Sequence, residues 1–407
     1  MTLRIFGILV LLTAIGSSCS TIRPDTPPSP RPIFATSLPL PTATSRPTPT
    51  ASPVPEPSPT ATPHQSPGLI ATLGETDSPW KGPYLPAFSP DGHSVVLAGT
   101  TVRMWDTQSL EQVRDFPNPT DQRCSIGNVA FSPDGALLAA SYACWAEEGQ
   151  PGHLLVWDSH TGKLLSDWLQ SQASLIFQDQ QPYSIPTTAF AFVPGSSLLA
   201  LGSGTTIEIR DPKNTEPPIV FSLGDNMYAT EISIRDDGQF LYVLMEWDKL
   251  NDFPYYWATA FRLQIWGLQT RDLRRVYDFP DSDYPKEGME LLGPNLVHYY
   301  YPEARAEVTD LTTDTTRDFV YRLGWKYYSP DSSYMAIARY RRIDPAEQGI
   351  EVWRVGTWRN LYTLRPRFGT DLMVSLDSIV FSPDNRTLAI AHDNGLSLWD
   401  IAPVVSP

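Results

Sequence analysis

The sequence predicts an all-β fold, a seven-bladed β-propeller of four-stranded antiparallel blades, preceded by a disordered tether rich in proline, threonine and serine. Three observations lead to this prediction. A turn phrase, FSPDG, stands at 88–92 and again at 131–135, and weaker copies follow along the chain. A dipeptide led mostly by tryptophan follows each copy at similar spacing. The unit recurs every 40–50 residues or so, which is typical of a repeat architecture.

The repeats cover most of the chain. The weaker turn copies are FVPGS at 192–196, IRDDG at 234–238, YSPDS at 328–332 and FSPDN at 381–385. The dipeptides are WD at 105–106 and 157–158, RD at 210–211, WG at 266–267, WR at 353–354 and WD at 399–400. A degenerate unit fits between 290 and 311 and brings the number of units to seven.

Each unit contains four short runs that read as strands. An apolar run ends in an aromatic residue, and Ser-Pro-Asp-Gly then turns the chain, because proline presets φ and glycine supplies positive φ. A second apolar run such as ALLAAS (136–141) follows, then an alternating run ending in Trp-Asp, and then a fourth run such as KLLSDW (163–168). Four strands with turns between them make a propeller blade. The tryptophans are predicted to pack between blades, because the alternation buries them.

The two ends of the repeat region predict how the ring closes. No fourth run follows Asp400, and the run LIATL at 69–73 stands upstream of the first full unit. Pairing this run with the last blade supplies the missing outer strand and leaves no open seam. We therefore expect one large domain over 69–407.

The FSPDG, LAA and VWD elements at this spacing resemble the WD40 repeat family, from about 69 to 401. The match is specific for the first, second and seventh units, good for the sixth and weak for the third to fifth. In the family a Gly-His pair precedes the first strand, but here Gly92-His93 and Gly152-His153 lie elsewhere. The family's buried Asp-His-Ser-Trp hydrogen-bond network is therefore not expected in this chain. The chain resembles the divergent bacterial form that grades into TolB-like propellers.

Residues 1–18 read as an export signal, with a single cation at Arg4 and an apolar stretch from Ile5 to Ile15 that is too short to span a membrane. Cys19 follows Gly16-Ser17-Ser18, which resembles a bacterial lipoprotein signal, although Gly16 stands where that signal usually has an aliphatic residue. The resemblance implies cleavage before Cys19 and a diacylglycerol on its thiol. The alternative is an ordinary secretory signal that is cut nearby.

The segment 19–68 is predicted to be a lipid-anchored, disordered linker. Residues 20–67 contain 15 proline and 16 serine or threonine residues, a composition that cannot bury a core. Residues 69–407 carry 26 basic and 43 acidic residues, which argues against nucleic acid and anionic membrane as partners. We expect a monomeric head, exported and held at the outer face of the cell membrane or the cell surface only through its lipid.

Cys124 and Cys144 flank one predicted hairpin. If Phe131 lies opposite Leu137, the same register places Cys124 opposite Cys144, within reach of a disulfide. The alternative is two free buried thiols, which is less common outside the cytoplasm.

The sequence contains no metal, nucleophile, phosphate-loop or dinucleotide motif, and no cofactor is predicted. Three carboxylates, Glu231, Glu290 and Asp377, fall in or beside the first strands of their blades, which line the axial channel. Such a ring is the weak candidate for a divalent cation.

The predicted turns between strands one and two, and three and four, are short, whereas 143–152, 169–187, 246–259, 280–288 and 340–349 are long. Long connections on one face mark it as a binding surface. The connection 246–259 is rich in aromatic residues suited to protein or sugar contacts: Trp247, Phe253, Tyr255, Tyr256 and Trp257. The alternative is that these side chains only pack the loop onto its blade.

Two functions remain open at this point. The first is a non-catalytic module that recognises a protein, or a glycan, at the cell surface. The second is a propeller enzyme of hydrolase, lyase or dehydrogenase type that uses a channel-bound cation, since propellers host many functions.

Overall fold

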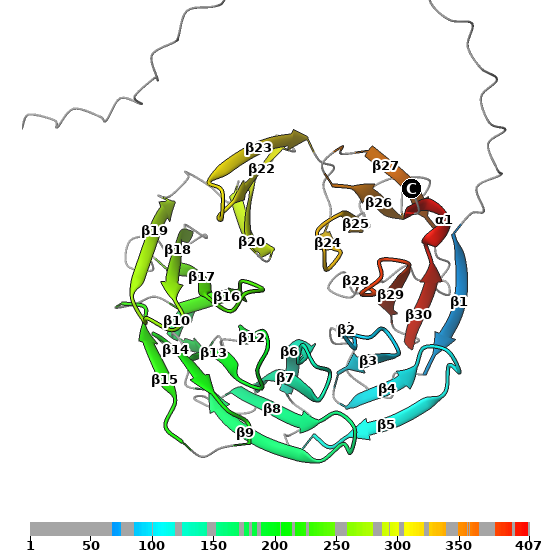
Figure 1. Ribbon diagram of the computed structural model, residues 1–407, viewed down its shortest axis with the longest axis horizontal. Coiled ribbons are helices and arrows are strands. Elements are labelled where there is room, and N and C mark those ends of the chain that lie inside the picture. Colours follow the sequence, from blue (N-terminus) through cyan, green and yellow to red (C-terminus); the bar gives the residue numbers. More distant parts are fainter. Residues whose placement is uncertain are drawn as a thin grey trace, which may run out of the picture. The chain divides into compact units, whose positions relative to one another are not determined.

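The computed structural model describes residues 67–74, 85–99, 101–118, 124–144, 152–170, 175–178, 181–184, 189–203, 205–213, 216–224, 228–248, 259–279, 287–292, 294–300, 305–320, 325–338, 349–355, 357, 359–365, 379–392 and 395–405. Within these ranges, some side chains at strand ends are also left undescribed. Seven four-stranded antiparallel sheets follow one another around a ring (Figure 1). The predicted seven-bladed propeller is confirmed.

The first four blades follow in chain order. Their strands are β2 (Leu85–Phe88), β3 (Ser94–Ala98), β4 (Val102–Asp106) and β5 (Gln112–Phe116); β6 (Cys124–Phe131), β7 (Leu137–Cys144), β8 (Gly152–Asp158) and β9 (Leu164–Gln170); β12 (Phe190–Phe192), β13 (Leu199–Ser203), β14 (Thr206–Arg210) and β15 (Ile219–Ser222); and β16 (Tyr228–Ile234), β17 (Phe240–Asp248), β18 (Thr259–Gly267) and β19 (Leu273–Phe279).

The remaining blades complete the ring. Their strands are β20 (Glu287–Leu292), β21 (Asn295–Tyr300), β22 (Arg305–Asp310) and β23 (Thr315–Val320); β24 (Trp325–Tyr328), β25 (Tyr334–Ala338), β26 (Ile350–Arg354) and β27 (Arg359–Leu364); and β28 (Ile379–Phe381), β29 (Thr387–His392), β30 (Gly395–Asp400) and β1 (Gly68–Leu73). The first strand of each blade is innermost, and β1 lies on the outer edge of β30 (Figure 1).

The Ser-Pro-Asp turn is a hydrogen-bonded unit that four blades share. In blade 2 the Ser132 hydroxyl donates to Asp134 at 2.6 Å and accepts from the backbone N–H of Leu137 at 2.8 Å. Gly135 follows at φ 72°, which glycine adopts without strain. The same bonds recur at Ser89, Ser329 and Ser382. Ser132 pairs with Leu137, and the four residues between them form the loop. Phe131 therefore lies opposite Leu138, not opposite Leu137 as the sequence suggested.

A β-bulge accompanies each tryptophan of the repeated dipeptide. Opposite Trp105, Trp157, Trp266 and Trp353, the fourth strand of the blade contains one extra residue. Blade 5, which has Thr309 at this position, pairs without a register shift, and blade 3 pairs without one up to Ile209, the residue before Arg210. The bulge therefore accompanies the indole, and an extra residue on one strand bends the edge of the sheet locally.

The closing strand β1 pairs antiparallel with β30 and repeats this geometry. Leu69 lies opposite Trp399, Ala71 lies opposite Leu398, and Ile70 is the bulged residue. The N-terminal strand thus occupies the position of an ordinary fourth strand, although it comes from the other end of the repeat region. The predicted closure through 69–73 is confirmed.

Alternate residues of a middle strand pack against the two neighbouring blades. In β7, Leu138 and Ala140 join a buried cluster with blade 1, whereas Leu137 and Ala139 join one with blade 3. Trp157 is fully buried, stacks edge-on against Phe116 and donates its indole N–H to the carbonyl of Pro117 at 2.8 Å. Burial on both faces explains why these strands read as unbroken apolar runs.

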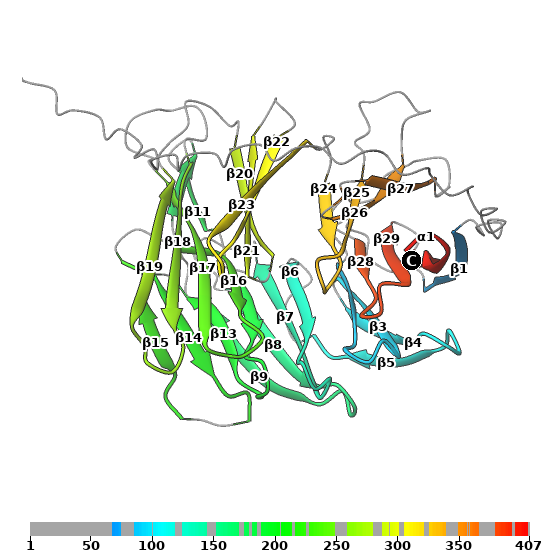
Figure 2. The same cartoon turned by 45° about the horizontal axis from the view of Figure 1, so that its top comes forward.

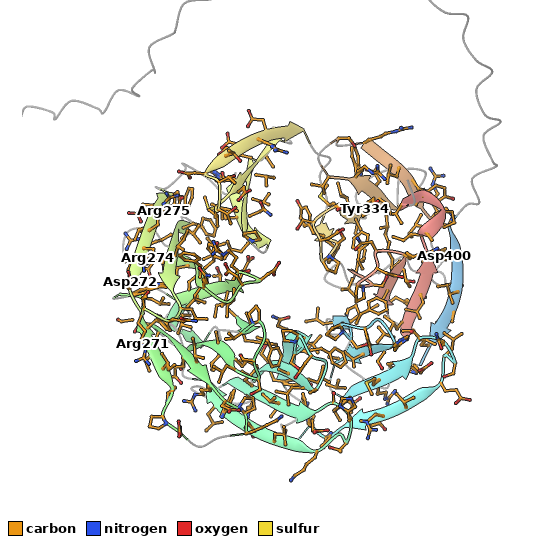
Figure 3. The ribbon with its side chains drawn as sticks, in the orientation of Figure 1. Arg271, Asp272, Arg274, Arg275, Tyr334 and Asp400 are labelled. Atoms are coloured by element: carbon orange, nitrogen blue, oxygen red, sulfur yellow. The ribbon has the colours of Figure 1, made fainter. Side chains whose placement is uncertain are left out.

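A short helix, α1 (Ala402–Val405), follows β30 and was not predicted. Ile401 and Val405 are buried in the cluster between blades 6 and 7, and Tyr334 donates its hydroxyl to the Val405 carbonyl at 2.6 Å. Figure 3 shows Tyr334 of β25 and Asp400 at the end of β30 on these adjacent blades. Blade 7 is therefore joined to blade 6 by α1 and completed on its outer side by β1.

One further element corrects the sequence prediction. A two-stranded hairpin, β10 (Leu175–Gln178) and β11 (Gln181–Ser184), lies inside the expected connection 169–187. It pairs with none of the blade strands that the structure describes. Among the residues that the structure describes, no helix is long and apolar enough to span a membrane.

Candidate functional site

Of the three carboxylates proposed to ring the channel, two lie on inner strands and the third lies outside the described residues. Glu231 is in β16, next to a bulge, and its carboxylate accepts a hydrogen bond from the backbone N–H of Leu291 in the next blade. Glu290 is in β20 and pairs with Val297, but its side chain lies outside the description, as does the whole of Asp377. Among the described residues, no group of three or more His, Cys, Asp or Glu is placed to hold a metal ion.

The long connections leave the blades at one end, which we call the long-connection face. They join strand two to strand three, as between β17 and β18, or one blade to the next, as between β27 and β28. The opposite end, the short-turn face, carries the turns between strands one and two and between strands three and four. The two kinds of short turn touch: in blade 1, the Thr107 hydroxyl donates to the carbonyl of Gly92 at 2.8 Å.

The aromatic connection starts later than the sequence suggested. Strand β17 continues through Trp247 to Asp248, and Trp247 lies opposite Ala260 of β18, so it is part of the sheet and not of the loop. Figure 2 shows β17 and β18 rising toward the long-connection face. Phe253, Tyr255, Tyr256 and Trp257 lie outside the described residues.

The two cysteines are opposed in the backbone register. Cys124 of β6 pairs with Cys144 of β7, although the register near the turn is one residue from that expected. A bulge at Gly127, between Ile126 and Asn128, restores the opposition. The side chains of both cysteines lie outside the description, and so do Cys19 and residues 1–66.

Arginines lie along the outer strands of blade 4, and three of them are paired with carboxylates. Figure 3 shows Arg271, Asp272, Arg274 and Arg275 along the outer side of this blade. Arg274 lies 2.9 Å from Asp272, Arg275 lies 3.3 Å from Asp314, and Arg262 pairs with Asp278. This pairing leaves little net positive charge there for an anionic partner.

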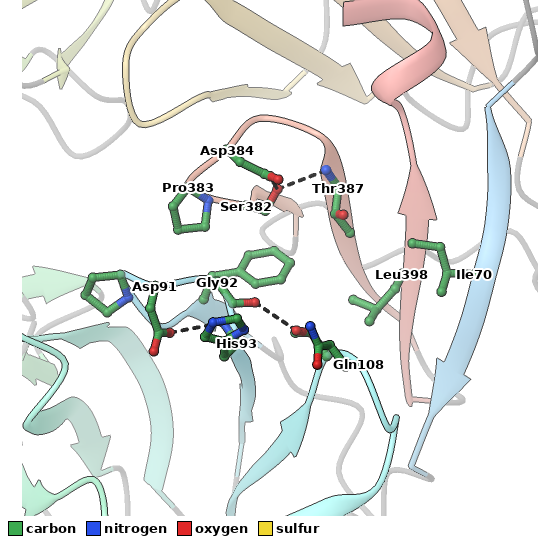
Figure 4. Close-up of a pocket in the computed structure, with 13 residues that line it drawn as sticks. Ile70, Asp91, Gly92, His93, Gln108, Ser382, Pro383, Asp384, Thr387 and Leu398 are labelled. Atoms are coloured by element: carbon green, nitrogen blue, oxygen red, sulfur yellow. Dashed lines mark hydrogen bonds between the residues drawn. The ribbon is translucent and has the colours of Figure 1, made fainter. Parts of the chain in front are cut away.

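A pocket of about 510 Å³ opens on the short-turn face at the seam between blades 7 and 1 (Figure 4). One wall is the blade 1 turn, Pro90–His93, with Thr107 and Gln108 beside it. The other wall is the blade 7 turn, Ser382–Asp384. Ile70 of the closing strand and Leu398 of β30 line its outer side.

The pocket carboxylates are held in place by the turns that contain them. Asp91 Oδ1 accepts the Ser89 hydroxyl at 2.5 Å and the backbone N–H of His93 at 3.0 Å. These hydrogen bonds lower the pKa of Asp91 below its ordinary value, because they stabilise the ionised form. Asp384 Oδ1 is bound in the same way, by the Ser382 hydroxyl at 2.6 Å and the N–H of Arg386 at 3.0 Å.

Sequence reasoning missed this pocket because it favoured the opposite face. The available signal was that the strong turn copies at 88–92 and 381–385 become neighbours once the ring closes. The copies are nearly 300 residues apart in the chain, so only the pairing of β1 with β30 brings them together.

Solved structures of similar fold bear out the architecture. A chain of the mitotic checkpoint complex is 14% identical, with a TM-score of 0.55, and the match covers 88% of this chain and 99% of that one. The β-propeller domain of Cps50 (Swd1) from Myceliophteria thermophila is 15% identical, with a TM-score of 0.56, over 83% and 100%. Hydrazine synthase of Kuenenia stuttgartiensis is 13% identical, with a TM-score of 0.54, over 82% and 99%. At these identities the likeness shows the fold alone.

No family model matches the chain, and no curated protein matches it.

Proposed function

We propose that this chain is a non-catalytic scaffold that binds a protein partner, and that the propeller is displayed outside the cell membrane on a tether lipidated at Cys19. A ring whose blades share buried clusters with their neighbours is a rigid support for recognition surfaces. Loops on such a support carry the contacts.

The observation that carries the proposal is the difference between the two faces. The three longest gaps between consecutive strands, 249–258, 339–349 and 365–378, all join strand ends on the long-connection face. On the short-turn face, most of the turns hold four to six residues, such as 89–93 and 107–111, and the longest, 211–218 in blade 3, holds eight. Length added mainly at one end is expected where that end recognises something, since stability alone favours short turns at both ends.

The comparisons support this proposal by analogy. One of the similar structures belongs to the mitotic checkpoint complex, which is a protein assembly by its name. For the present chain, the aromatic segment after β17 offers the residues that dominate protein interfaces, Tyr and Trp.

The test is affinity capture from an envelope extract with the full-length chain. The wild type should retain a specific protein. Replacing Tyr255, Tyr256 and Trp257 together with Ala should reduce its retention by tens of fold, because large aromatic anchors typically contribute about 2 kcal/mol or more each when they are hot spots. Trp247 is left unchanged, since it belongs to strand β17.

Val113 and Leu273, 46% and 42% exposed at the short-turn ends of β5 and β19, provide the matched control. Replacing both with Ala removes exposed apolar surface away from the long-connection face and should leave capture unchanged. Equal loss in the two variants would contradict the proposed face, and failure of the wild type to retain any protein would contradict the scaffold function. Elution of a bound polysaccharide instead would show that the partner is a glycan.

A further inference from the structure

The seam pocket combines fixed negative charge with apolar walls. Among the residues that line it, Asp91 and Asp384 carry carboxylates, and no lysine or arginine is present. The carboxylates come from two different blades, one on each wall. The only other titratable group on the lining is the imidazole of His93.

Both carboxylates are ordered before any ligand arrives. Each uses Oδ1 to accept a serine hydroxyl and a backbone N–H, and Oδ2 takes no part in these bonds. An acceptor that is already fixed loses little conformational entropy when it binds a cation. An anionic ligand would meet two like charges and no cation.

The apolar part of the pocket comes from the closing strand, from its neighbour β30 and from the blade 1 and blade 7 turns with Phe88. Ile70 is the bulged residue of β1 and remains 45% exposed, whereas Leu398 beneath it is buried. Pro90 and Pro383 add apolar surface next to the two carboxylates. A long side chain with an aliphatic stem and a cationic end matches this combination, because the stem can cover apolar surface while the end meets the acids.

We propose that the seam pocket binds the side chain of a lysine or arginine presented by the protein partner. This proposal rests on the proposed scaffold function, and it adds a second contact surface on the short-turn face. Because Ile70 belongs to β1, the pocket exists only in the closed ring, so recognition and closure depend on the same strand.

The probes for the test are three blocked tripeptides with lysine, arginine or norleucine at the centre. They are titrated at pH 7.5 into the isotopically labelled full-length chain, and amide shifts are followed by nuclear magnetic resonance. The lysine and arginine peptides should give saturable shifts at Gly92, His93 and Thr387. The norleucine peptide, which keeps the stem without the charge, should bind at least about ten-fold more weakly.

Two matched pairs of variants separate the pocket from the turn. Asp91→Asn and Asp384→Asn keep an oxygen that accepts the hydrogen bonds of the turn but remove the charge, and each should raise the dissociation constant about five-fold. Asp134→Asn makes the same change in blade 2, away from the pocket, and should have no effect. Ile70→Ala should weaken binding, whereas Val113→Ala, at the equivalent bulge of blade 1, should not.

Raising the salt concentration from about 0.05 to 0.5 M should weaken binding of the lysine peptide to the wild type, and this readout needs no variant. The proposal would be overturned if no peptide gives saturable amide shifts, or if the lysine and norleucine peptides bind equally well. It would also be overturned if Asp91→Asn and Asp134→Asn weaken binding of the lysine peptide equally. If the double variant Asp91→Asn/Asp384→Asn captures the envelope partner as well as the wild type does, the scaffold function stands and the pocket proposal fails.

Discussion

At the scale of single residues, the most informative side chains are the serine and aspartate of the repeated turn. Ser132 is fully buried, and its hydroxyl both donates to Asp134 and accepts from the N–H of Leu137. The motif therefore works as a hydrogen-bonded turn, and this structural role is sufficient to explain why it recurs. The aspartates that follow Trp105 and Trp157 have a similar role, since Asp106 accepts the N–H of Ser109 at 2.7 Å and Asp158 accepts the N–H of Thr161 at 2.8 Å.

Ser132→Ala should lower the free energy of unfolding by about 1–3 kcal/mol, because it leaves the buried N–H of Leu137 without its side-chain acceptor. Urea unfolding followed by circular dichroism measures the change. The control is Ser109→Ala, at an exposed position in a blade 1 turn, which should stay within about 0.5 kcal/mol of the wild type. Equal effects of the two substitutions would contradict the role assigned to the Ser132 hydroxyl.

The Asp134 carboxylate should make stability depend on acid pH. The Ser132 hydroxyl, with the N–H of Ala136, lowers its pKa in the folded state below the ordinary value of 3.8. Its contribution is therefore complete above about pH 5 and is lost as the pH falls through the folded-state pKa. Unfolding free energies of the wild type and Asp134→Asn should differ by a constant amount from pH 5 to 7 and converge toward pH 2. A difference that grows as the pH falls would show that the folded state does not lower the pKa of Asp134.

At the scale of elements, β1 and the bulges decide how the ring closes. The bulge at Ile70 matches those in the other four blades with the tryptophan, so Trp399 is accommodated as Trp105 and Trp157 are. Gly395 begins β30 at φ 124°, and a Cβ there would overlap the carbonyl oxygens of Leu73 and Gly74. The end of β1 therefore approaches the start of β30 closely because that residue is glycine.

Gly395→Ala should detach the end of β1 and lower the melting temperature more than Gly195→Ala does. Gly195 also has positive φ, at 71°, but nothing lies within 4 Å of a Cβ built there, so alanine costs only the backbone strain, about 1–2 kcal/mol. Deleting 69–74 should cost at least as much as Gly395→Ala. Calorimetry measures all three, and similar melting temperatures for the two alanine variants would argue against a tight contact at this point.

Cys124 and Cys144 should form a disulfide across the β6–β7 hairpin. Directly opposed residues of an antiparallel pair have Cα atoms about 4.5–5.5 Å apart, within the range that a disulfide spans. Maleimide should label neither residue in denatured, unreduced protein and both after reduction, with mass spectrometry assigning the sites. Labelling of both without reductant would show free thiols.

At the scale of the whole molecule, the order of the segments along the chain bears on where the propeller is displayed. The proposed lipid at Cys19, then the proline-rich segment 20–67, then the ring is the order expected of the surface-displayed head that we propose. The linker in polyproline form rises about 3.1 Å per residue, so its 48 residues from 20 to 67 would reach roughly 100 Å or more.

If Cys19 carries the lipid, as we propose, Cys19→Ala should accumulate the unprocessed precursor and abolish labelling with a fatty-acid analogue, because lipidation of the thiol would precede cleavage. Globomycin treatment of the wild type should give the same precursor. Ser18→Ala retains the cysteine and a small residue before it and serves as the control, with processing expected to continue. Normal processing of Cys19→Ala would show that the leader is an ordinary secretory signal.

The sequence by itself determined the number of blades, their four-stranded plan and the closing role of 69–73, because these follow from local turn chemistry and from alternating burial along each run. Only the tertiary structure decided the bulges beside the tryptophans, the one-residue register difference at Phe131 and the strand position of Trp247. These depend on how an indole or a serine hydroxyl fits against a neighbouring strand, and the residue pattern of one strand does not contain that information. The seam pocket was decided in the same way, because Asp91 and Asp384 become neighbours only when distant ends of the chain complete one sheet.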